Sequence, residues 1–554
     1  MAFKSSDRDA VKWLYKSSGP QLGRLAAVMF CNCVYASTSV IFALMCRGVI
    51  DGAVDGDRNG IIKYALGLLG VILLQLALRL ICNSLEESVK AGLEIGLRDG
   101  MLRSVMKKEY SSVAGIHSGE ILNRMFSDVQ IVSEGVTGIL PSFVNMVTRL
   151  VCAVAVLIAL DRSFTLLFLA AGVVMFAVSK LFRGRIKRLH RTMQSCEGRV
   201  RSFLQETVEN LLAVKTFGCE ERMSAENGKN QQSYYRARMK KRNVTVFANA
   251  GFGFVFQAGY LCAMLWGAGG IYSGAMTYGT LTAILQLVNQ IQAPFAGLSG
   301  LFPKLYSCLA SAERIMELEG LPDEPPAGKT LDYADLRSIE FRNVCFSYGE
   351  NTVLTDVSVS VSKGEFASLT GISGGGKSTL FLLIMGAYKP DSGEIVFTSS
   401  KGDFLPGLET RGLIAYVPQG NILFSGTVAE NIAFLKPDAS LDEIYAAAET
   451  ACAAEFIGLL PDGYETAVGE NGFGISEGQA QRIAIARALL GGAPMILLDE
   501  ATSALDEATE AKLLKNIAGL KDKTVLIVTH RPAALKICGK RLLLKDGGIE
   551  YGKL

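Results

Sequence analysis

The nine residues GISGGGKST, from Gly371 to Thr379, have the types and spacing of a phosphate-binding loop. In the pattern GxxxxGKS, glycines let backbone N–H groups wrap around phosphate oxygens. Lys377 would reach the outer phosphates of a nucleotide, and the Ser378 hydroxyl would ligate Mg²⁺. A short Gly-rich stretch also occurs in ordinary loops, so other motifs must support this interpretation. The expected phosphate-contacting residues are Gly371, Ser373, Gly374, Gly375, Gly376, Lys377, Ser378 and Thr379.

Two acids follow an apolar run in MILLDE, residues 495–500. The run reads as a buried strand, which places Asp499 and Glu500 at its carboxyl end, where open α/β sheets bind their ligands. We expect Asp499 to hold Mg²⁺ through water and Glu500 to polarise an attacking water.

The elements that must position these motifs alternate between strand-like and helix-like segments. EFASLT precedes the glycine loop and TLFLLIMG follows it, as a strand and a helix should. SIEFRNVCF and TVLIVT read as further strands, so residues 338–554 are expected to be a soluble α/β domain. Residues 321–337 form a linker whose start is rich in Pro and Gly.

Residues 1–320 have a different composition, because long stretches contain no charge. Leu25–Cys46 is a run of 22 uncharged residues, enough for one membrane-spanning helix. Further spans are expected at about 61–82, 140–160 and 164–182. Asn243–Pro303 contains 61 residues without Lys, Arg, Asp or Glu, and the Gly-rich segment 267–279 inside it predicts a turn between a fifth and a sixth span.

Two long helical connections, about 83–135 and 183–242, follow the second and fourth spans. The second contains 15 Lys or Arg and 6 Glu, so the positive-inside rule places both connections in the cytoplasm. Both termini are then cytoplasmic as well. The net charge of +3 gives no indication of nucleic-acid binding.

Taken together, these segments resemble the ABC transporter family, specifically an exporter-type half-transporter. Residues 325–554 look like its ATPase domain, and residues 1–320 look like its six-span membrane domain. The fold class is then multidomain, with an all-α six-helix transmembrane domain followed by an α/β P-loop NTPase domain. The family motifs occur in order in FSYGENTVL, YVPQGNILF, AVGENG, GISEGQ, SALD and VTHRP.

The resemblance implies a role for one residue in each motif. Tyr348 matches the aromatic that stacks on adenine, Gln419 the Q-loop glutamine that also ligates Mg²⁺, and His530 the switch histidine. Asp506 matches the D-loop, and Glu470 matches the exporter-specific x-loop. In this family ATP lies between the P-loop of one ATPase domain and the signature segment of another, so the resemblance implies a dimer.

The signature segment departs from the usual LSGGQ and reads ISEGQ. Ser476, Gly478 and Gln479 are kept as expected nucleotide contacts, whereas Glu477 replaces the first glycine. An outward-facing carboxylate would favour the N-terminus of the following helix, so the substitution is expected to be tolerated. The alternative is that the chain supplies the weaker signature of an asymmetric heterodimer.

Two arginines, Arg79 and Arg149, lie in expected spans that contain no Asp or Glu. An arginine inside a membrane must find water, carbonyls, lipid phosphate or substrate. Arg149 near mid-span would favour a substrate with an anionic group if it faces a cavity, and snorkelling or a carbonyl contact is the alternative.

The expected function is ATP-driven export or flipping of amphipathic small molecules, peptides or lipids by alternating access. The resemblance also implies short coupling helices near 111–118 and 209–217 that dock on ATPase surfaces close to Gln419 and Glu470. A siderophore-type importer of the same fold is an alternative. An ATP-gated channel is a further one that no sequence feature supports.

Overall fold

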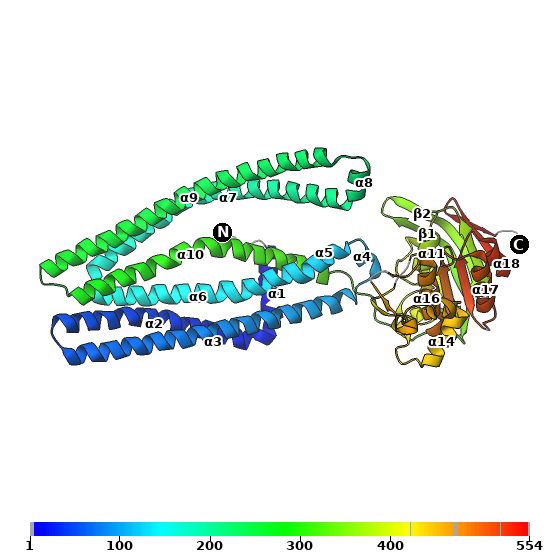
Figure 1. Cartoon of the computed structure of the whole chain (residues 1–554), viewed down its shortest axis with the longest axis horizontal. Coiled ribbons are helices and arrows are strands. Elements are labelled where there is room, and N and C mark those ends of the chain that lie inside the picture. The colour runs from blue at the N-terminus through cyan, green and yellow to red at the C-terminus, as the bar shows by residue number, and fades with distance from the viewer. Residues whose placement is uncertain (1–4, 421–422, 470–473, 521, 552–554) are drawn as a thin grey trace. The chain divides into compact units, whose positions relative to one another are not determined.

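The computed structural model describes residues 5–420, 423–469, 474–520 and 522–551, and the chain forms two compact units (Figure 1). Unit 1 comprises Met1–Val105 and Ser118–Gly320, and unit 2 comprises Met106–His117 and Leu321–Leu554. The chain therefore crosses between the units after residues 105, 117 and 320. The last crossing follows Gly320. Met106–His117, by contrast, packs with the α/β unit although it lies in the first helical connection.

Unit 1 is helical throughout the residues that the structure describes. Its helices are α1 (Ser5–Ser17), η1 (Gly19–Gln21), α2 (Leu22–Val54), α3 (Arg58–Val105), α5 (Ser118–Asn123), the π-helical turn η2 (Arg124–Asp128), α6 (Val129–Leu160), α7 (Arg162–Glu209), α8 (Leu211–Thr216), α9 (Glu220–Tyr272) and α10 (Tyr278–Glu319).

Within unit 1, α2 packs against α3, α6 and α10, while α7 and α9 form a long hairpin with α8 at its tip (Figure 1). Four segments in the described residues are long and apolar enough to cross a membrane: Gly19–Val54, Arg58–Val105, Ser118–Leu160 and Glu220–Tyr272. They contain the expected spans one, two, three and five. Spans four and six fall in the long helices α7 and α10 and remain predictions.

Unit 2 is built on two main sheets. An antiparallel sheet has the order β2-β1-β4-β5, and a six-stranded sheet has the order β12-β11-β3-β10-β9-β6. In the second sheet β11, β3, β10, β9 and β6 are parallel, and only β12 is antiparallel. The strands are β1 (Leu336–Tyr348), β2 (Asn351–Ser362), β3 (Phe366–Gly371), β4 (Ser392–Ser399), β5 (Gly402–Phe404), β6 (Ile414–Val417), β7 (Gly426–Thr427), β8 (Ala467–Val468), β9 (Met495–Asp499), β10 (Thr524–Val528), β11 (Lys540–Lys545) and β12 (Gly548–Tyr551).

Unit 2 also contains α-helices and 3₁₀-helices. They are α4 (Tyr110–Ala114), α11 (Lys377–Ile384), α12 (Leu408–Arg411), α13 (Val428–Ile432), η3 (Ala433–Leu435), α14 (Leu441–Thr450), α15 (Ala454–Ile457), η4 (Gly463–Glu465), α16 (Glu477–Leu490), α17 (Glu507–Ala518) and α18 (Pro532–Ile537).

The central strands are buried on both faces. In β9, Ile496 and Leu498 belong to one hydrophobic cluster, whereas Met495 and Leu497 belong to a second. This explains why the strand sequence is a continuous apolar run, as is usual for parallel sheets. Because β3, β10 and β9 are adjacent and parallel, the residues that follow them meet at one edge of the sheet.

Candidate nucleotide site

The glycine loop connects β3 to α11, as its sequence predicts. Gly371, Gly374 and Gly376 have φ of 151°, 75° and 100°, a region that side chains strongly disfavour. A Cβ at Gly371 would lie 2.4 Å from the backbone oxygen of Leu544, and one at Gly376 would lie 2.5 Å from Val353 Cγ1. The loop therefore needs glycine at these positions for both its backbone path and its packing.

Lys377 begins α11, and its residue is only 5% exposed. Its Nζ donates to the backbone oxygens of Gly371 and Ile372, both at 2.9 Å, and lies 4.0 Å from Glu500 Oε1. The ammonium is therefore held inside the loop by the loop's own carbonyls. This geometry keeps a cation at the N-terminus of a helix, where the helix dipole also favours an anion.

Asp499 ends β9 and Glu500 follows it with φ of 50°, a strained conformation for a residue with a side chain. The Glu500 N–H donates to Val528 O at 3.1 Å, which ties this turn to the neighbouring strand β10. Gln419 Nε2 donates to Glu500 Oε2 at 2.9 Å. The Q-loop glutamine and the expected general base are therefore in direct contact.

The surroundings of Asp499 fit a divalent cation. Burial raises the pKa of its carboxyl, while hydrogen bonds from Ser378 and Tyr416 act in the opposite direction. Tyr416 donates to Oδ2 at 3.2 Å, but Oδ1 is buried and has no hydrogen-bond partner among the described residues. A buried carboxylate oxygen without a partner is costly, and a hydrated Mg²⁺ would satisfy it. Ser378, Asp499 and Gln419 are the residues that could hold the ion.

Tyr348 lies at the end of β1 and is 39% exposed. Its hydroxyl is 3.5 Å from Thr379 Oγ1, so it is next to the phosphate loop. Its ring meets Tyr388 edge-on, with centroids 5.4 Å apart, and Tyr388 meets Tyr110 in the same way at 5.9 Å. An exposed ring beside the loop can stack on a base.

Within unit 2, the segment 106–117 packs against this aromatic group. Besides Tyr110, Glu109 Oε1 accepts from Lys389 Nζ at 2.6 Å. The helices expected near 111–118 and 209–217 are present as α4 and α8. The first therefore docks beside Tyr388 and Lys389. Among the described residues it makes no hydrogen bond or ion pair with Gln419, and Glu470 lies outside the described residues.

His530 is exposed and follows β10 at the same sheet edge. The next residue, Arg531, donates to Leu505 O at 2.6 Å and to Glu510 Oε2 at 3.2 Å. Asp506 caps α17 by accepting from Thr509 N at 2.9 Å, and this hydrogen bond lowers the pKa of its carboxyl. Arg531 thus joins the histidine segment to the loop that contains Asp506.

The signature segment forms the N-terminus of α16. The Ser476 hydroxyl accepts from Gln479 N at 3.3 Å, and Gln479 Oε1 accepts from Ser476 N at 2.9 Å, which is a capping box. Glu477 is exposed in the first turn. A Cβ at Gly478 would lie 2.7 Å from Ala504 O, so this glycine is required by the neighbouring loop within the same chain.

The expected site residues therefore form two groups. One contains the glycine loop, Tyr348, Gln419, Asp499 and Glu500, and the other contains the signature residues with Asp506. Among the described residues, no hydrogen bond or ion pair joins Ser476 or Gln479 to the glycine loop. The P-loop and the signature of one chain are thus not brought together by direct contacts.

Three contributors were not identified from the sequence. Tyr416 contacts Asp499, and it could have been noticed because it lies three residues before Gln419 on a strand of the same sheet. Tyr388 contacts Tyr348 and Arg531 contacts Leu505, and no local sequence pattern predicts either contact.

Comparison with known proteins gives matches to two family models and to several relatives. Residues 25–295 match the family model for the ABC transporter transmembrane region, and residues 354–503 match the model for ABC transporter. A candidate multidrug export ATP-binding/permease protein of Bacillus subtilis (strain 168) is 31% identical over 461 residues, covering 82% of this chain and 79% of that protein.

A second relative is the ATP-dependent lipid A-core flippase of Chromobacterium violaceum, 31% identical over 531 residues, which cover 95% of this chain and 91% of the flippase. Among solved structures, a bacterial Atm1-family ABC exporter with ATP bound has a TM-score of 0.81 and 24% identity, over 96% of this chain and 95% of that one. At this identity the structural match shows the fold alone. The matched segments, the two relatives and the shared fold together show that this membrane protein belongs to the ABC transporter family.

Proposed function

We propose that the chain is a half-transporter that exports or flips amphipathic molecules and uses ATP hydrolysis at a dimer interface. The observation that carries this proposal is the separation just described. The glycine loop and the catalytic acids form one surface, while Ser476 and Gln479 cap α16 without contacting that loop. A second copy would supply the missing signature to each loop.

Each residue of the proposed site has a role that its contacts support. Lys377 and the glycine loop would bind the phosphates, and Tyr348 would stack on the adenine. Ser378, Gln419 and Asp499 would hold Mg²⁺, which when bound neutralises charge on the phosphates. Glu500 would accept a proton from the attacking water, since Gln419 holds its Oε2 and leaves the carboxylate near Lys377.

The remaining motif residues would complete the site at the dimer interface. His530 is exposed at the sheet edge and would contact the outermost phosphate. Arg531 connects this segment to the loop containing Asp506, so the two should move together. Ser476, Gly478 and Gln479 would contact the nucleotide bound by the partner copy.

The tip of the α7–α9 hairpin supports a dimer as well. Leu212 and Phe217 are 81% and 76% exposed there, and Leu211 is 50% exposed. Apolar side chains in such a group usually mark an interaction surface. We infer that this tip docks on the ATPase unit of the partner copy. We propose that the ATPase units and both termini lie in the cytoplasm, because the basic connection 183–242 follows the positive-inside rule.

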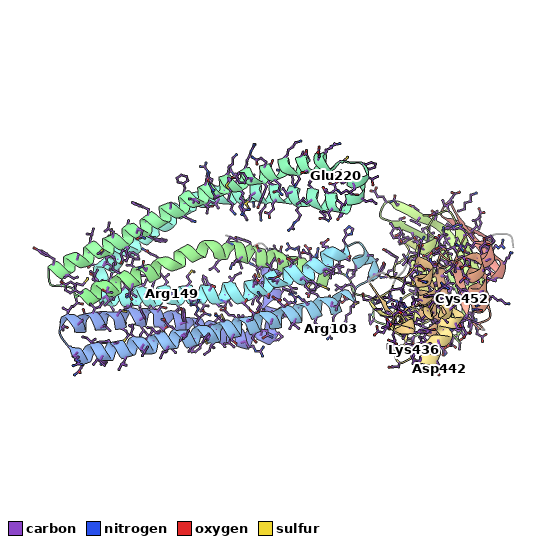
Figure 2. All side chains as sticks on the ribbon, in the orientation of Figure 1. Arg103, Arg149, Glu220, Lys436, Asp442 and Cys452 are labelled. Atoms are coloured by element: carbon purple, nitrogen blue, oxygen red, sulfur yellow. The ribbon has the colours of Figure 1, made fainter. Side chains whose placement is uncertain are left out.

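The cargo of the transporter is inferred from unit 1. Gln290 and Gln292 of α10 donate to backbone oxygens of Ser39 and Phe256, at 2.8 and 3.1 Å, so they hold neighbouring helices. Arg149 lies on α6 (Figure 2). Its Nε, like Gln290 Oε1, is buried without a hydrogen-bond partner among the described residues. A guanidinium in an apolar span favours an anionic group. We propose that the cargo includes amphiphiles with such a group.

Export is favoured over siderophore-type uptake by the relatives, one named for multidrug export and one for lipid A-core flipping. The decisive experiment is ATP turnover and lipid flipping by the purified chain in proteoliposomes, with its oligomeric state measured. The proposal predicts turnover only from dimers. Equal turnover by isolated monomers would refute it. A requirement for a different chain would instead favour the heterodimer alternative.

A further inference from the structure

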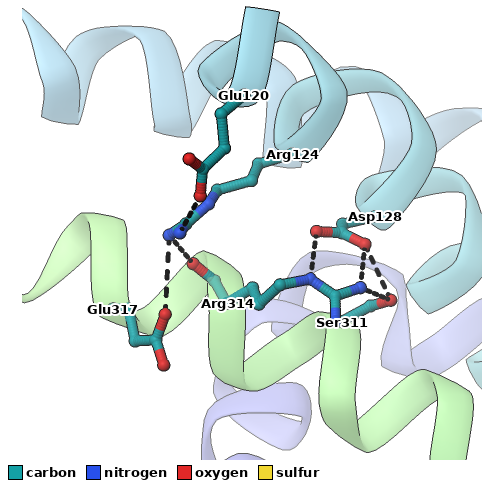
Figure 3. Close-up of polar contacts among 6 residues, drawn as sticks. All are labelled: Glu120, Arg124, Asp128, Ser311, Arg314 and Glu317. Carbon is teal, nitrogen blue, oxygen red and sulfur yellow. Dashed lines mark hydrogen bonds and ion pairs between the residues drawn. The ribbon is translucent and has the colours of Figure 1, made fainter. Parts of the chain in front are cut away.

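Asp128 is a buried carboxylate whose contacts cross from the π turn η2 to α10 (Figure 3). Its side chain is only 2% exposed. Oδ2 accepts from Arg314 Nε at 2.9 Å, and Oδ1 accepts from Ser311 Oγ at 2.9 Å and from Arg314 Nη2. The bidentate contact satisfies the acid almost completely, and this geometry is among the most directional that proteins make.

A second arginine lies one turn away and crosses between the same elements. Arg124 Nη1 donates to the backbone oxygen of Arg314 at 2.7 Å, and Nη2 donates to Glu120 at 2.6 Å. Glu317 lies 3.7 Å from Nη1 (Figure 3). The Arg124 side chain is 11% exposed. The two arginines therefore interlock, because each reaches the element from which the other extends.

These linked charged residues lie close to two of the points where the chain passes between the units. The chain re-enters unit 1 at Ser118, after the docked segment 106–117, and leaves unit 1 after Gly320. The linked residues occupy positions 120–128 and 311–317, next to these two crossings. A π turn inserts an extra residue into a helix and often marks a functional position. Here it spans both Arg124 and Asp128.

A matching connection lies within unit 2, next to the crossings after residues 105 and 320. Lys108 and Asp323 form an isolated antiparallel bridge, with Glu109 N donating to Pro322 O at 3.0 Å and Glu324 N to Lys107 O at 2.8 Å. Lys108 Nζ also donates to Leu321 O and to Asp323 Oδ1, both at 2.7 Å. The two segments by which the chain enters the ATPase unit, after residues 105 and 320, are thus joined as well.

We propose that Arg124, Asp128, Ser311 and Arg314 form a clasp that makes the two crossings at 117/118 and 320/321 move as one body. The contacts given above for these four residues all lie within unit 1, so they are positioning residues for energy coupling. With the clasp closed, a displacement of the docked segment 106–117 is transmitted to α6 and α10 together. Without the clasp, the ATPase unit would still hydrolyse ATP, but α6 and α10 would respond separately to a displacement of the segment 106–117.

The inference rests on the proposed function, and its test separates the two. The variant is Asp128→Asn, which keeps the shape of the side chain and removes its charge. The matched control is Asp99→Asn in α3, which breaks an i,i+4 pair with Arg103 whose side chains are 57% and 76% exposed. Both variants are studied as full-length dimers in lipid nanodiscs and proteoliposomes. The probe is a fluorescently labelled phosphatidylethanolamine, whose flipping is measured per ATP hydrolysed.

A second measurement does not depend on cargo. Hydrogen–deuterium exchange of residues 118–128 and 308–319 is compared with and without vanadate-trapped nucleotide. In the wild type and in Asp99→Asn, both segments should change protection together. In Asp128→Asn, only 118–128 should respond, and lipid flipped per ATP should fall by about fivefold or more with basal hydrolysis retained.

The clasp is refuted if both segments of Asp128→Asn still respond together, or if its flipping per ATP equals that of Asp99→Asn. A general rise in exchange across unit 1 without nucleotide would show a purely structural role and would refute it as well. If Asp128→Asn does not fold, Arg314→Lys keeps the charge, loses the bidentate contact and carries the same expectations. If the wild type flips no probe lipid, the proposed cargo is wrong, while the exchange result still decides the clasp.

Discussion

Replacing Gly478 with alanine tests whether the signature segment and the D-loop are fitted to each other within one chain. The added Cβ would lie 2.7 Å from Ala504 O, and ordinary contact begins at 3.4 Å. The D-loop backbone cannot move away freely. Gln481 binds it at Ser503 Oγ and Ala504 N, at 3.1 and 3.2 Å, and Arg531 binds it at Leu505 O.

Overpacking of this kind costs about 1–3 kcal/mol. For a domain of this size, that loss should lower the unfolding temperature of the ATPase unit by about 2–12 °C. If the strain falls on the signature geometry, hydrolysis should drop by about 5- to 150-fold. Differential scanning fluorimetry and phosphate release, both on the full-length dimer in lipid, measure the two effects.

The matched control is Gly539→Ala, because a Cβ at Gly539 meets nothing within 4 Å and its φ is ordinary. This variant should behave like the wild type in both assays. If Gly478→Ala were as stable and as active as Gly539→Ala, the close fit of α16 against the D-loop would not constrain the site, and the reasoning would fail.

Further predictions concern single charges in the site. Glu500→Gln should lower hydrolysis by about 100-fold or more while ATP stays bound, measured by phosphate release and filter binding, and retained hydrolysis would contradict its role as general base. Burial raises the pKa of Asp499, so protons should compete with Mg²⁺ at a higher pH than they do at an ordinary aspartate. Mg²⁺ titrations at decreasing pH, starting from neutral, should show that the wild type loses Mg²⁺ affinity. An unchanged Mg²⁺ affinity would argue against Asp499 as a ligand. Glu477→Gly should leave the KM for ATP within about twofold, because an exposed, screened carboxylate contributes little, and a large fall in KM would show that it faces the phosphates.

The site could be predicted from the sequence where chemistry is local. The glycine loop follows a strand and opens a helix, and Asp499 ends a strand, so their meeting at one sheet edge follows from parallel pairing alone. The capping box between Ser476 and Gln479 also has a sequence signal, namely serine followed three residues later by glutamine. This capping box explains why the signature holds its shape with Glu477 in the first turn.

Other features depend on pairings that a single sequence does not encode. Asp128 and Arg314 are 186 residues apart, and nothing local distinguishes them from other charges in cytoplasmic helices. The exchange of 106–117 into unit 2 depends on contacts with Tyr388 and Lys389, more than 270 residues away. Such long-range pairs are fixed by tertiary packing, which overrides local preference.

If Tyr348 stacks on adenine as proposed, the row of rings Tyr348, Tyr388 and Tyr110 connects the nucleobase to the segment 106–117. Edge-on ring contacts depend on the position of each ring, so a shift of the first ring displaces the next. Binding of the purine would then shift the segment 106–117 independently of the binding of the triphosphate. Inorganic tripolyphosphate should therefore bind the glycine loop without changing amide hydrogen exchange in residues 106–117. Only a nucleotide that carries its base should slow the exchange of these residues.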